Sequence, residues 1–420
     1  MNQGVFESLI ENKSQQKRMM WLILAAFSLE TIIRYVVIFI TKLPVVSAFS
    51  GAFKPVLYIC LIFMNYESWI RKRVKVTDIL FVWFFFFVVL VSYFVFPDTR
   101  EFVEQQKNIL FLVFPLYYLM GVVFTTDKDT METLGFLAKV IILVDILFAV
   151  YWTSSGNELG TDAMARAYAI LPSVLFLIMC AFNRSKTWDW IWMIFASIYI
   201  FTCGTRGPII VIAVYLLYCL LVKRRNTMSK KILYTTFVAG FVIFYNSPAF
   251  EIAIQGLMDL FKQLGVSTRI FEHMLGDTMI SDMSGREDIY AKIFQLISEN
   301  PLGYGVLGEY PFLGWNTHNL YLQFFMHYGI VFGGLMIFFS LFLVIKAFKN
   351  NPNVYARDFV AMWFCITFAR SFAGGSYLTY YFAFMLGLAV NELRNKKYLY
   401  KTMSSMTLPQ SFLQMLYKTT

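Results

Sequence analysis

Repeated apolar runs of about 18–25 residues constrain the fold of this chain more than any other feature. Each run can cross the hydrocarbon core of a membrane as one helix, because a helix rises about 1.5 Å per residue. A sequence that is 58% hydrophobic and only 15% charged is also unlike a soluble globular protein. The pattern therefore predicts an all-α, polytopic integral membrane protein.

About twelve membrane-spanning helices are expected. They lie near residues 19–41, 44–65, 78–96, 108–124, 133–152, 166–183, 188–203, 208–222, 232–247, 318–345, 358–373 and 377–391. The first run is too long for a cleaved signal sequence, so we expect it to be retained as a span. No low-complexity linker or soluble domain interrupts the runs, and residues 1–420 are treated as a single membrane domain.

Positive charge alternates between successive connections. Most of the 36 Lys and Arg residues follow even-numbered spans, as in 71–75 and 223–231, whereas the opposite connections are acidic or mixed. Cytoplasmic connections are the basic ones, so both termini are expected in the cytoplasm and the long connection 248–317 outside. The net charge of +10 reflects this bias, and we expect no nucleic-acid partner.

The external loop has helical periodicity of its own. Residues Glu251–Leu264 and Glu287–Glu299 each place apolar side chains on one face, for example Ile289, Ile293 and Leu296. Such short helices could lie at the membrane interface or cap a cavity. A packed cap that carries no chemistry is the alternative.

Two arginines beside glycines are candidate anion-binding groups. Arg206 lies between Thr205 and Gly207, where a ligand can approach the backbone closely, and its planar guanidinium suits phosphate oxygens. Arg286 follows Gly285 at the expected start of a helix, whose amides could join it in holding an anion. The alternatives are an arginine reaching lipid headgroups for Arg206 and a local salt bridge for Arg286.

His318 is the candidate general base. It is one of only three histidines, and it lies at the expected start of the tenth span, beside Asn319. His327 would be on the opposite side of that helix, about 180° around and roughly 13 Å deeper, and is interpreted as a packing residue. Residues 303–308 spell GxGxxG but lack the preceding strand of a dinucleotide site, so we predict a tight turn.

Two further arginines belong to the expected outer ends of spans, namely Arg166 and Arg370, and they could join Asn319 in binding substrate. Charges inside the spans, such as Lys139 and Asp145, are scattered and suggest no relay. The five cysteines show no disulfide or metal spacing, and we expect no metal and no cofactor.

The ordered motifs resemble the O-antigen ligase/polymerase superfamily of bacterial surface-polysaccharide assembly. They are GTRG at 204–207, GR at 285–286, NPLGYG at 300–305, THNLYLQ at 317–323 and YG at 328–329. The first half of the chain is similar only in hydropathy and topology. The resemblance implies a membrane glycosyltransferase of GT-C-like fold in the bacterial plasma membrane, with its active site facing outward.

The resemblance also implies roles for particular residues. Arg206 and Arg286 would bind the diphosphate of an undecaprenyl-diphosphate-linked saccharide, and His318 would activate the acceptor hydroxyl without a metal ion. Expected partners are this lipid-linked glycan, the bilayer, and a chain-length regulator and flippase of the same pathway.

The motif wording favours a polymerase that joins repeat units over a ligase that transfers the finished glycan to lipid A–core or another acceptor. A lipid-linked oligosaccharide flippase is the alternative from another class. It would be expected to show internal repeats and a charged midplane cavity, and the sequence has no such repeat.

Overall fold

The computed structural model describes residues 63, 74–124, 126–154, 160–203, 205–223, 228–229, 232, 236, 247–263, 286–349, 351, 353–372 and 374–405. Every regular element in this part of the chain is helical, which confirms the all-α prediction there. The α-helices and the short 3₁₀ or π segments (η) are, in order, α4 (Val76–Val95), η3 (Pro97–Thr99), α5 (Arg100–Gln105), η4 (Ile109–Val113), α6 (Phe114–Val123), α7 (Lys128–Ser154), α8 (Gly160–Arg184), α9 (Thr187–Thr202), α10 (Arg206–Leu217), η5 (Tyr218–Val222), α12 (Pro248–Gln263), α15 (Arg286–Glu299), α16 (Tyr310–Leu313), α17 (Leu320–Lys349), α18 (Val354–Phe364), η6 (Cys365–Ala369), η7 (Arg370–Phe372) and α19 (Tyr380–Ser405).

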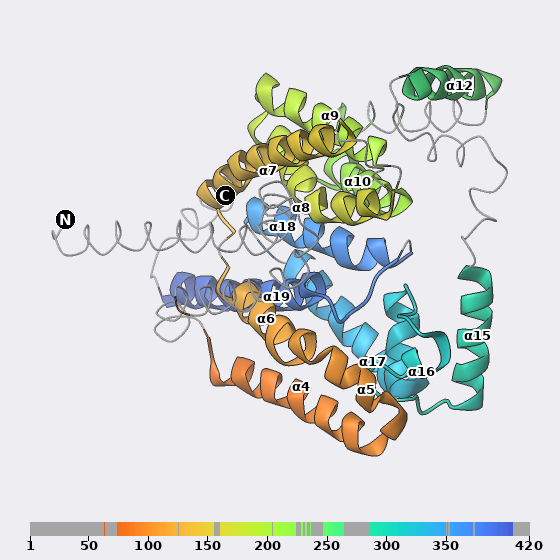
Figure 1. Ribbon diagram of the computed structural model, residues 1–420. Coiled ribbons are helices and arrows are strands. Elements are labelled where there is room, and N and C mark those ends of the chain that lie inside the picture. The colour runs from red at the N-terminus through yellow and green to blue at the C-terminus, as the bar shows by residue number, and fades with distance from the viewer. Residues whose placement is uncertain are drawn as a thin grey trace. The chain divides into compact units, whose positions relative to one another are not determined.

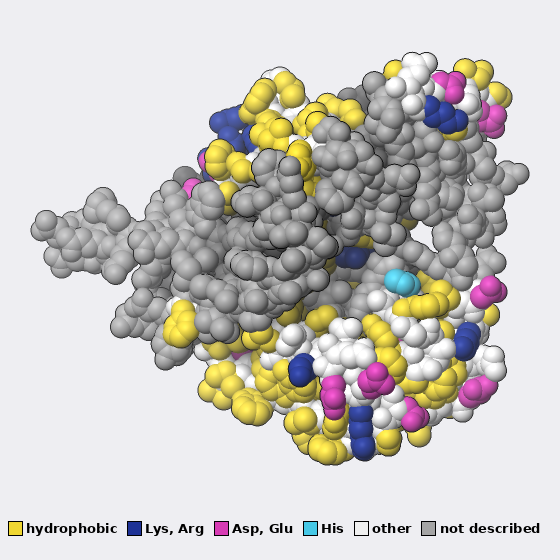
Figure 2. Space-filling model, in the orientation of Figure 1, with side chains coloured by type: hydrophobic (Ala, Val, Ile, Leu, Met, Phe, Trp, Pro, Cys, Tyr) yellow, Lys and Arg dark blue, Asp and Glu magenta, His cyan; other side chains and the backbone are white. Residues whose placement is uncertain are grey.

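Four described helices are long and apolar enough to cross a membrane, which supports the predicted membrane character. They are α4, Lys128–Tyr151 of α7, Arg166–Arg184 of α8, and α17. A pair bent by 70°, Pro97–Gln105 with Ile109–Val123, makes a fifth if it is counted as one span. Exposed side chains such as Trp83 and Phe94 of α4 suit a lipid-facing surface, and Figure 2 shows hydrophobic side chains over this helix.

Other predicted spans coincide only partly with helices that are long enough to cross a membrane. Residues 188–203 and 208–222 fall on the shorter apolar helices α9 and α10–η5, and the last two spans fall on α18–η6–η7 and α19. The predicted spans 19–41, 44–65 and 232–247 lie almost entirely outside the described residues. The count of twelve therefore stays a prediction.

The chain divides into two compact units. Unit 1 comprises the described residues of 40–133 and 291–420, and unit 2 comprises those of 134–290. In unit 1, helices α6 and α19 lie side by side (Figure 1) and run parallel at very close range. A Cβ on Gly121 would lie 2.2 Å from the carbonyl oxygen of Phe384, and one on Gly387 would lie 2.0 Å from that of Tyr118. Glycine at both positions is what allows the two backbones to approach.

The helices of unit 1 alternate in direction, so its connections gather at two ends. At one end, which we call the basal end, Arg394 makes a bidentate ion pair with Asp78 (2.6 and 2.7 Å). Nearby, Thr126 and Asn351 donate to the carboxylate of Glu392, both at 2.6 Å. The other end, which we call the loop end, contains η3, residues 300–319 and residues 374–379. This grouping agrees with the alternation predicted for these spans.

Unit 2 pairs the charges that the sequence analysis described as scattered. Lys139 of α7 lies 2.9 Å from Asp189 of α9, and Arg184 lies 3.3 Å from the same carboxylate. Asp145 pairs with Arg166 at 3.0 Å, and both side chains are only 2% exposed. These charges, scattered in the sequence, are therefore paired in the fold, because a buried charge in an apolar bundle is retained where it finds a partner.

Both helices predicted within the long loop are present. Helix α12 spans Pro248–Gln263 and buries Phe250, Ile254 and Met258 along one face. Helix α15 spans Arg286–Glu299, and Ile293 on its apolar face is fully buried. The periodicity of the apolar residues was therefore sufficient to locate the ends of both helices to within three residues.

Candidate functional site

His318 lies in a hydrogen-bonded turn at the loop end of unit 1. Its φ of +52° falls in the left-handed region, which residues other than glycine rarely adopt. Its N–H donates to Oδ1 of Asn316 at 2.9 Å, and the neighbouring Thr317 hydroxyl donates to the carbonyl of Asn319 at 2.8 Å. A third bond runs from the N–H of Gly375 to the carbonyl of His318 at 3.1 Å. The turn is thus fixed by its surroundings, which is the condition under which such strain persists.

Helix α17 begins after this turn, at Leu320, and Asn319 caps it. The Asn319 Oδ1 accepts the N–H groups of Tyr321 (3.0 Å) and Leu322 (3.2 Å), which have no partner within the helix. His318 therefore precedes the helix. The expectation that His318 and His327 lie on opposite faces of one continuous helix is wrong.

The cap yields a test of the binding role predicted for Asn319. We expect Asn319→Ala to lower the free energy of unfolding by about 1 kcal/mol, because two amide donors lose their acceptor. Asn319→Asp keeps an acceptor at the helix N-terminus, so its thermal unfolding and its surface-polysaccharide product should match those of the wild type. Loss of product in Asn319→Asp at an unchanged melting temperature would instead favour direct contact of the amide with substrate.

The glycine-rich segment 301–305 is a turn packed against an interruption in α17. The N–H of Tyr304 donates to the carbonyl of Met326 (2.7 Å), and that of Gly305 donates to His327 (3.1 Å). At Gly329, φ is +73° and ψ is 178°, values outside a helix. A Cβ on Gly303 would lie 2.5 Å from the nitrogen of Gly329, so backbone fills the space beside the glycines. The rejection of a dinucleotide site agrees with this packing.

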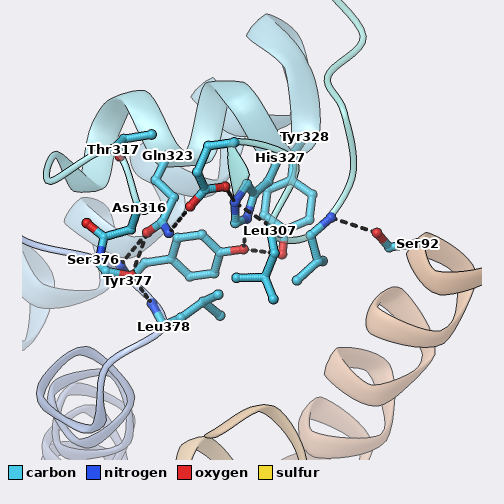
Figure 3. Close-up of polar contacts among 12 residues, drawn as sticks. Ser92, Leu307, Asn316, Thr317, Gln323, His327, Tyr328, Ser376, Tyr377 and Leu378 are labelled. Carbon is cyan, nitrogen blue, oxygen red and sulfur yellow. Dashed lines mark hydrogen bonds and ion pairs between the residues drawn. The ribbon is translucent and has the colours of Figure 1, made fainter. Parts of the chain in front are cut away.

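A buried polar network joins this turn to α17 (Figure 3). The carboxylate of Glu309, which is fully buried, lies in close contact with Nε2 of His327. Its other oxygen accepts from Nε2 of Gln323 at 2.8 Å. Oε1 of Gln323 in turn accepts the hydroxyl of Ser376 at 2.6 Å. These contacts connect Gln323 with a residue 53 positions away, and Glu309 and Gln323 themselves are almost without exposure to solvent.

The imidazole of His327 extends the network to two tyrosines. Its Nδ1 lies 2.6 Å from the hydroxyl of Tyr377, which donates to the hydroxyl of Tyr328 at 2.8 Å. The N–H of Leu307 donates to Nε2 of His327 at 3.1 Å. His327 is therefore a polar member of a buried network, and its interpretation as a packing residue is wrong.

Tyr310 lies beside this network, in helix α16 of the loop. Burial, and next the negative charge of Glu309, raise the pKa of Tyr310 above its ordinary value, while a hydrogen bond with Asn316 lowers it. The phenol is thus protonated at neutral pH. Because Asn316 also accepts the N–H of His318, it connects α16 to the His318 turn.

The structure brings Arg370 close to His318. Nε of Arg370 donates to the carbonyl of Gly374 at 3.2 Å, and the guanidinium lies over the ring of Tyr381 at 5.6 Å. The next residue, Gly375, is the one bonded to the carbonyl of His318. Of the six predicted site residues, His318, Asn319 and Arg370 therefore gather at the loop end of unit 1.

The three other predicted arginines belong to unit 2. Arg206 and Arg286 are the first residues of α10 and α15, positions suited to anions, and their side chains lie outside the described parts. Arg166 is buried in α8, where Asp145 and the hydroxyl of Tyr199 surround its guanidinium. Convergence of these arginines on His318 stays a prediction.

Several residues of the network escaped the sequence analysis. Glu309, Gln323 and Tyr377 contact one another across long sequence separations, which spacing does not reveal. Gln323 did carry a signal, because it ends the THNLYLQ motif. In the part of the chain that is described, no group of three His, Cys, Asp or Glu side chains could hold a metal ion.

Comparisons with known proteins give one result. Residues 191–339, about a third of the chain, match the family model described as O-Antigen ligase. No curated protein and no solved structure matches. The matched segment contains Arg206, Arg286, Glu309 and the His318 turn, and it ends inside α17. The match supports membership of this chain in the O-antigen ligase/polymerase family, and with it a function in surface-polysaccharide assembly.

Proposed function

We propose that this protein is a polysaccharide repeat-unit polymerase, a glycosyltransferase that joins saccharides carried on undecaprenyl diphosphate. The observation that carries the proposal is the His318 turn. A histidine is held in a strained conformation beside Arg370, inside the segment that matches the family. Strain that several hydrogen bonds maintain is typical of functional sites.

In the proposed reaction His318 takes the proton from an acceptor sugar hydroxyl. The acceptor oxygen forms a bond to the anomeric carbon of the donor, with inversion. The bond from that carbon to the diphosphate oxygen breaks, and undecaprenyl diphosphate leaves with the electron pair. Arg206 and Arg286, with Arg370 as a further cation, stabilise the charge on the leaving group in place of a metal ion. Arg166 is not included, because its guanidinium is buried and paired with Asp145.

The membrane arrangement is part of the same proposal. We place both termini in the cytoplasm of a bacterium, with about twelve spans of the plasma membrane in a GT-C-like arrangement and the loop end facing outward. The support is the excess of Lys and Arg on the opposite connections. A lipid-linked donor suits a site where polar loops meet apolar helices.

A ligase is the second candidate. The description of the matched family favours it, since that description names an O-antigen ligase. A ligase would use the same groups to transfer a finished glycan to lipid A–core or another acceptor. The wording of the motifs favours the polymerase.

The experiment that tests the proposal compares wild type with His318→Ala, Arg206→Ala and Arg286→Ala in a strain deleted for this gene. Surface polysaccharide is run on a gel, and membrane levels of each variant are measured. We expect each variant to lose the ladder and retain single-repeat material, because general base catalysis and charge stabilisation each contribute about 10²–10⁴-fold.

Arg100→Ala provides a matched control, since Arg100 is an exposed arginine at the loop end whose guanidinium bonds backbone carbonyls of α4 and lies over the ring of Tyr93. It should preserve the ladder. Accumulation of long lipid-linked polymer without ligated chains would instead identify the protein as a ligase. Wild-type ladders in all three variants would reject the catalytic assignment and favour a transporter.

A further inference from the structure

The side-chain amide of Gln323 makes three hydrogen bonds. Its Oε1 accepts two donors, the hydroxyl of Ser376 (2.6 Å) and the N–H of Tyr377 (3.1 Å). Its Nε2 donates to Glu309 at 2.8 Å, and Gln323 is 1% exposed. Because the amide both donates and accepts, only one orientation of it satisfies these bonds. Gln323 therefore holds the segment at 376–377 in one position relative to α17.

That segment continues directly into the contacts of the candidate site. Gly375 donates its N–H to the carbonyl of His318 at 3.1 Å. The carbonyl of Gly374 accepts Nε of Arg370 at 3.2 Å. A continuous path of short contacts therefore leads from Gln323, through residues 374–377, to both His318 and Arg370.

Glu309 fixes the other side of Gln323. The carboxylate is fully buried and contacts Nε2 of His327, whose opposite nitrogen lies 2.6 Å from Tyr377. Tyr377 is thereby attached twice, once through its N–H to Gln323 and once through its hydroxyl to His327. A buried network in which every member is bonded is rigid, and removing one member leaves the others without partners.

We propose that Gln323 and Glu309 are positioning residues, which hold residues 374–377 against the turn and thereby fix the backbone of His318 and the side chain of Arg370. This inference rests on the proposed function, because it assigns the network to the geometry of that site. Both residues act on His318 through the segment 374–377. Their effect is on its placement, and a displacement of about 1 Å at a reacting group can cost about 100-fold in rate.

The test uses the full-length protein in nanodiscs and the variants Gln323→Leu and Glu309→Gln. Leucine removes the amide but keeps an apolar body of similar size. Glutamine at 309 keeps an oxygen for Gln323 and presents an N–H to His327. We expect Gln323→Leu to lower kcat about 100-fold, with the KM for lipid-linked saccharide extracted from the deletion strain nearly unchanged. Glu309→Gln should retain most of kcat.

Hydrogen exchange gives a readout that is independent of activity. In Gln323→Leu the amide of Gly375 should exchange about tenfold faster, because the segment that bears it loses its anchor. The matched control is Asn351→Leu, which removes a buried amide bonded to Glu392 and to the N–H of Asn353 at the basal end. It should leave both kcat and the Gly375 amide at wild-type values.

If His318→Ala is inactive, as the proposed function requires, two outcomes would overturn the inference. One is wild-type exchange and kcat in Gln323→Leu, and the other is an equal loss of kcat in Asn351→Leu. Failure of the proposed function looks different, because His318→Ala would then retain kcat.

Discussion

Replacement of His318 by glycine is expected to abolish polysaccharide product while leaving the protein as stable as the wild type, or more stable by about 1 kcal/mol. Glycine adopts a φ near +52° without the steric cost that a Cβ imposes, so the turn is retained and its strain is relieved. The same change removes the imidazole, and the loss of the general base should lower the reaction rate about 10²–10⁴-fold. Thermal unfolding of the purified protein and a gel of the surface polysaccharide measure the two effects.

Ser185 offers a matched control for this change. It also has a positive φ, +53°, and it lies between α8 and α9, remote in sequence from the motifs. Ser185→Gly should give a similar gain in stability with a complete polysaccharide ladder. If His318→Gly also gave a complete ladder, the histidine would not be the base.

Replacement of Gly329 by alanine is expected to remove most folded protein from the membrane, at a cost of about 3 kcal/mol or more. The combination of φ +73° and ψ 178° is accessible almost only to glycine. A Cβ there would also lie 2.4 Å from the carbonyl oxygen of Pro301, a backbone atom that cannot move away without breaking the turn. Membrane abundance and the melting temperature in detergent measure the loss.

Gly256→Ala is the control for a glycine-to-alanine change as such. Gly256 lies in α12, and nothing lies within 4 Å of the position a Cβ would take. Alanine there should stabilise the helix by about 1 kcal/mol. Wild-type abundance of Gly329→Ala would mean that α17 tolerates a regular helix at this point, and the interruption would lose its structural explanation.

The apolar pattern was a reliable guide to where helices occur. It located α4, α17 and the loop helices α12 and α15, because length and periodicity of apolar residues are local properties. It gave no sign of the interruption at Gly329. That backbone conformation depends on carbonyl and amide groups of residues 301–305, which approach α17 only in the folded chain.

For the candidate site, too, local features could be predicted from the sequence and contacts between distant residues could not. His318, Asn319 and Arg370 all lie at the loop end of unit 1, whereas their role in a site stays a prediction. The strained turn at His318 is held by Asn316, Thr317 and Gly375 acting together. The partners of Glu309, Gln323 and Asp145 are 14 to 54 residues distant in sequence, and no spacing rule connects them. A single sequence therefore reveals which polar residues are unusual, but not which of them meet.

The interruption of α17 also limits how substrates can reach the site. The carbonyls of Met326 and His327 and the N–H of Ile330 all bond the turn at 301–305. If that turn lifted away, these three groups would be left without partners in a helix that is apolar enough to span a membrane, at a cost of several kcal/mol each. The glycine turn is thus a fixed part of the structure around α17 and not a mobile lid. Under the proposed function, a lipid-linked donor would therefore enter past some other segment, and engineering a wider entrance would begin elsewhere in the protein.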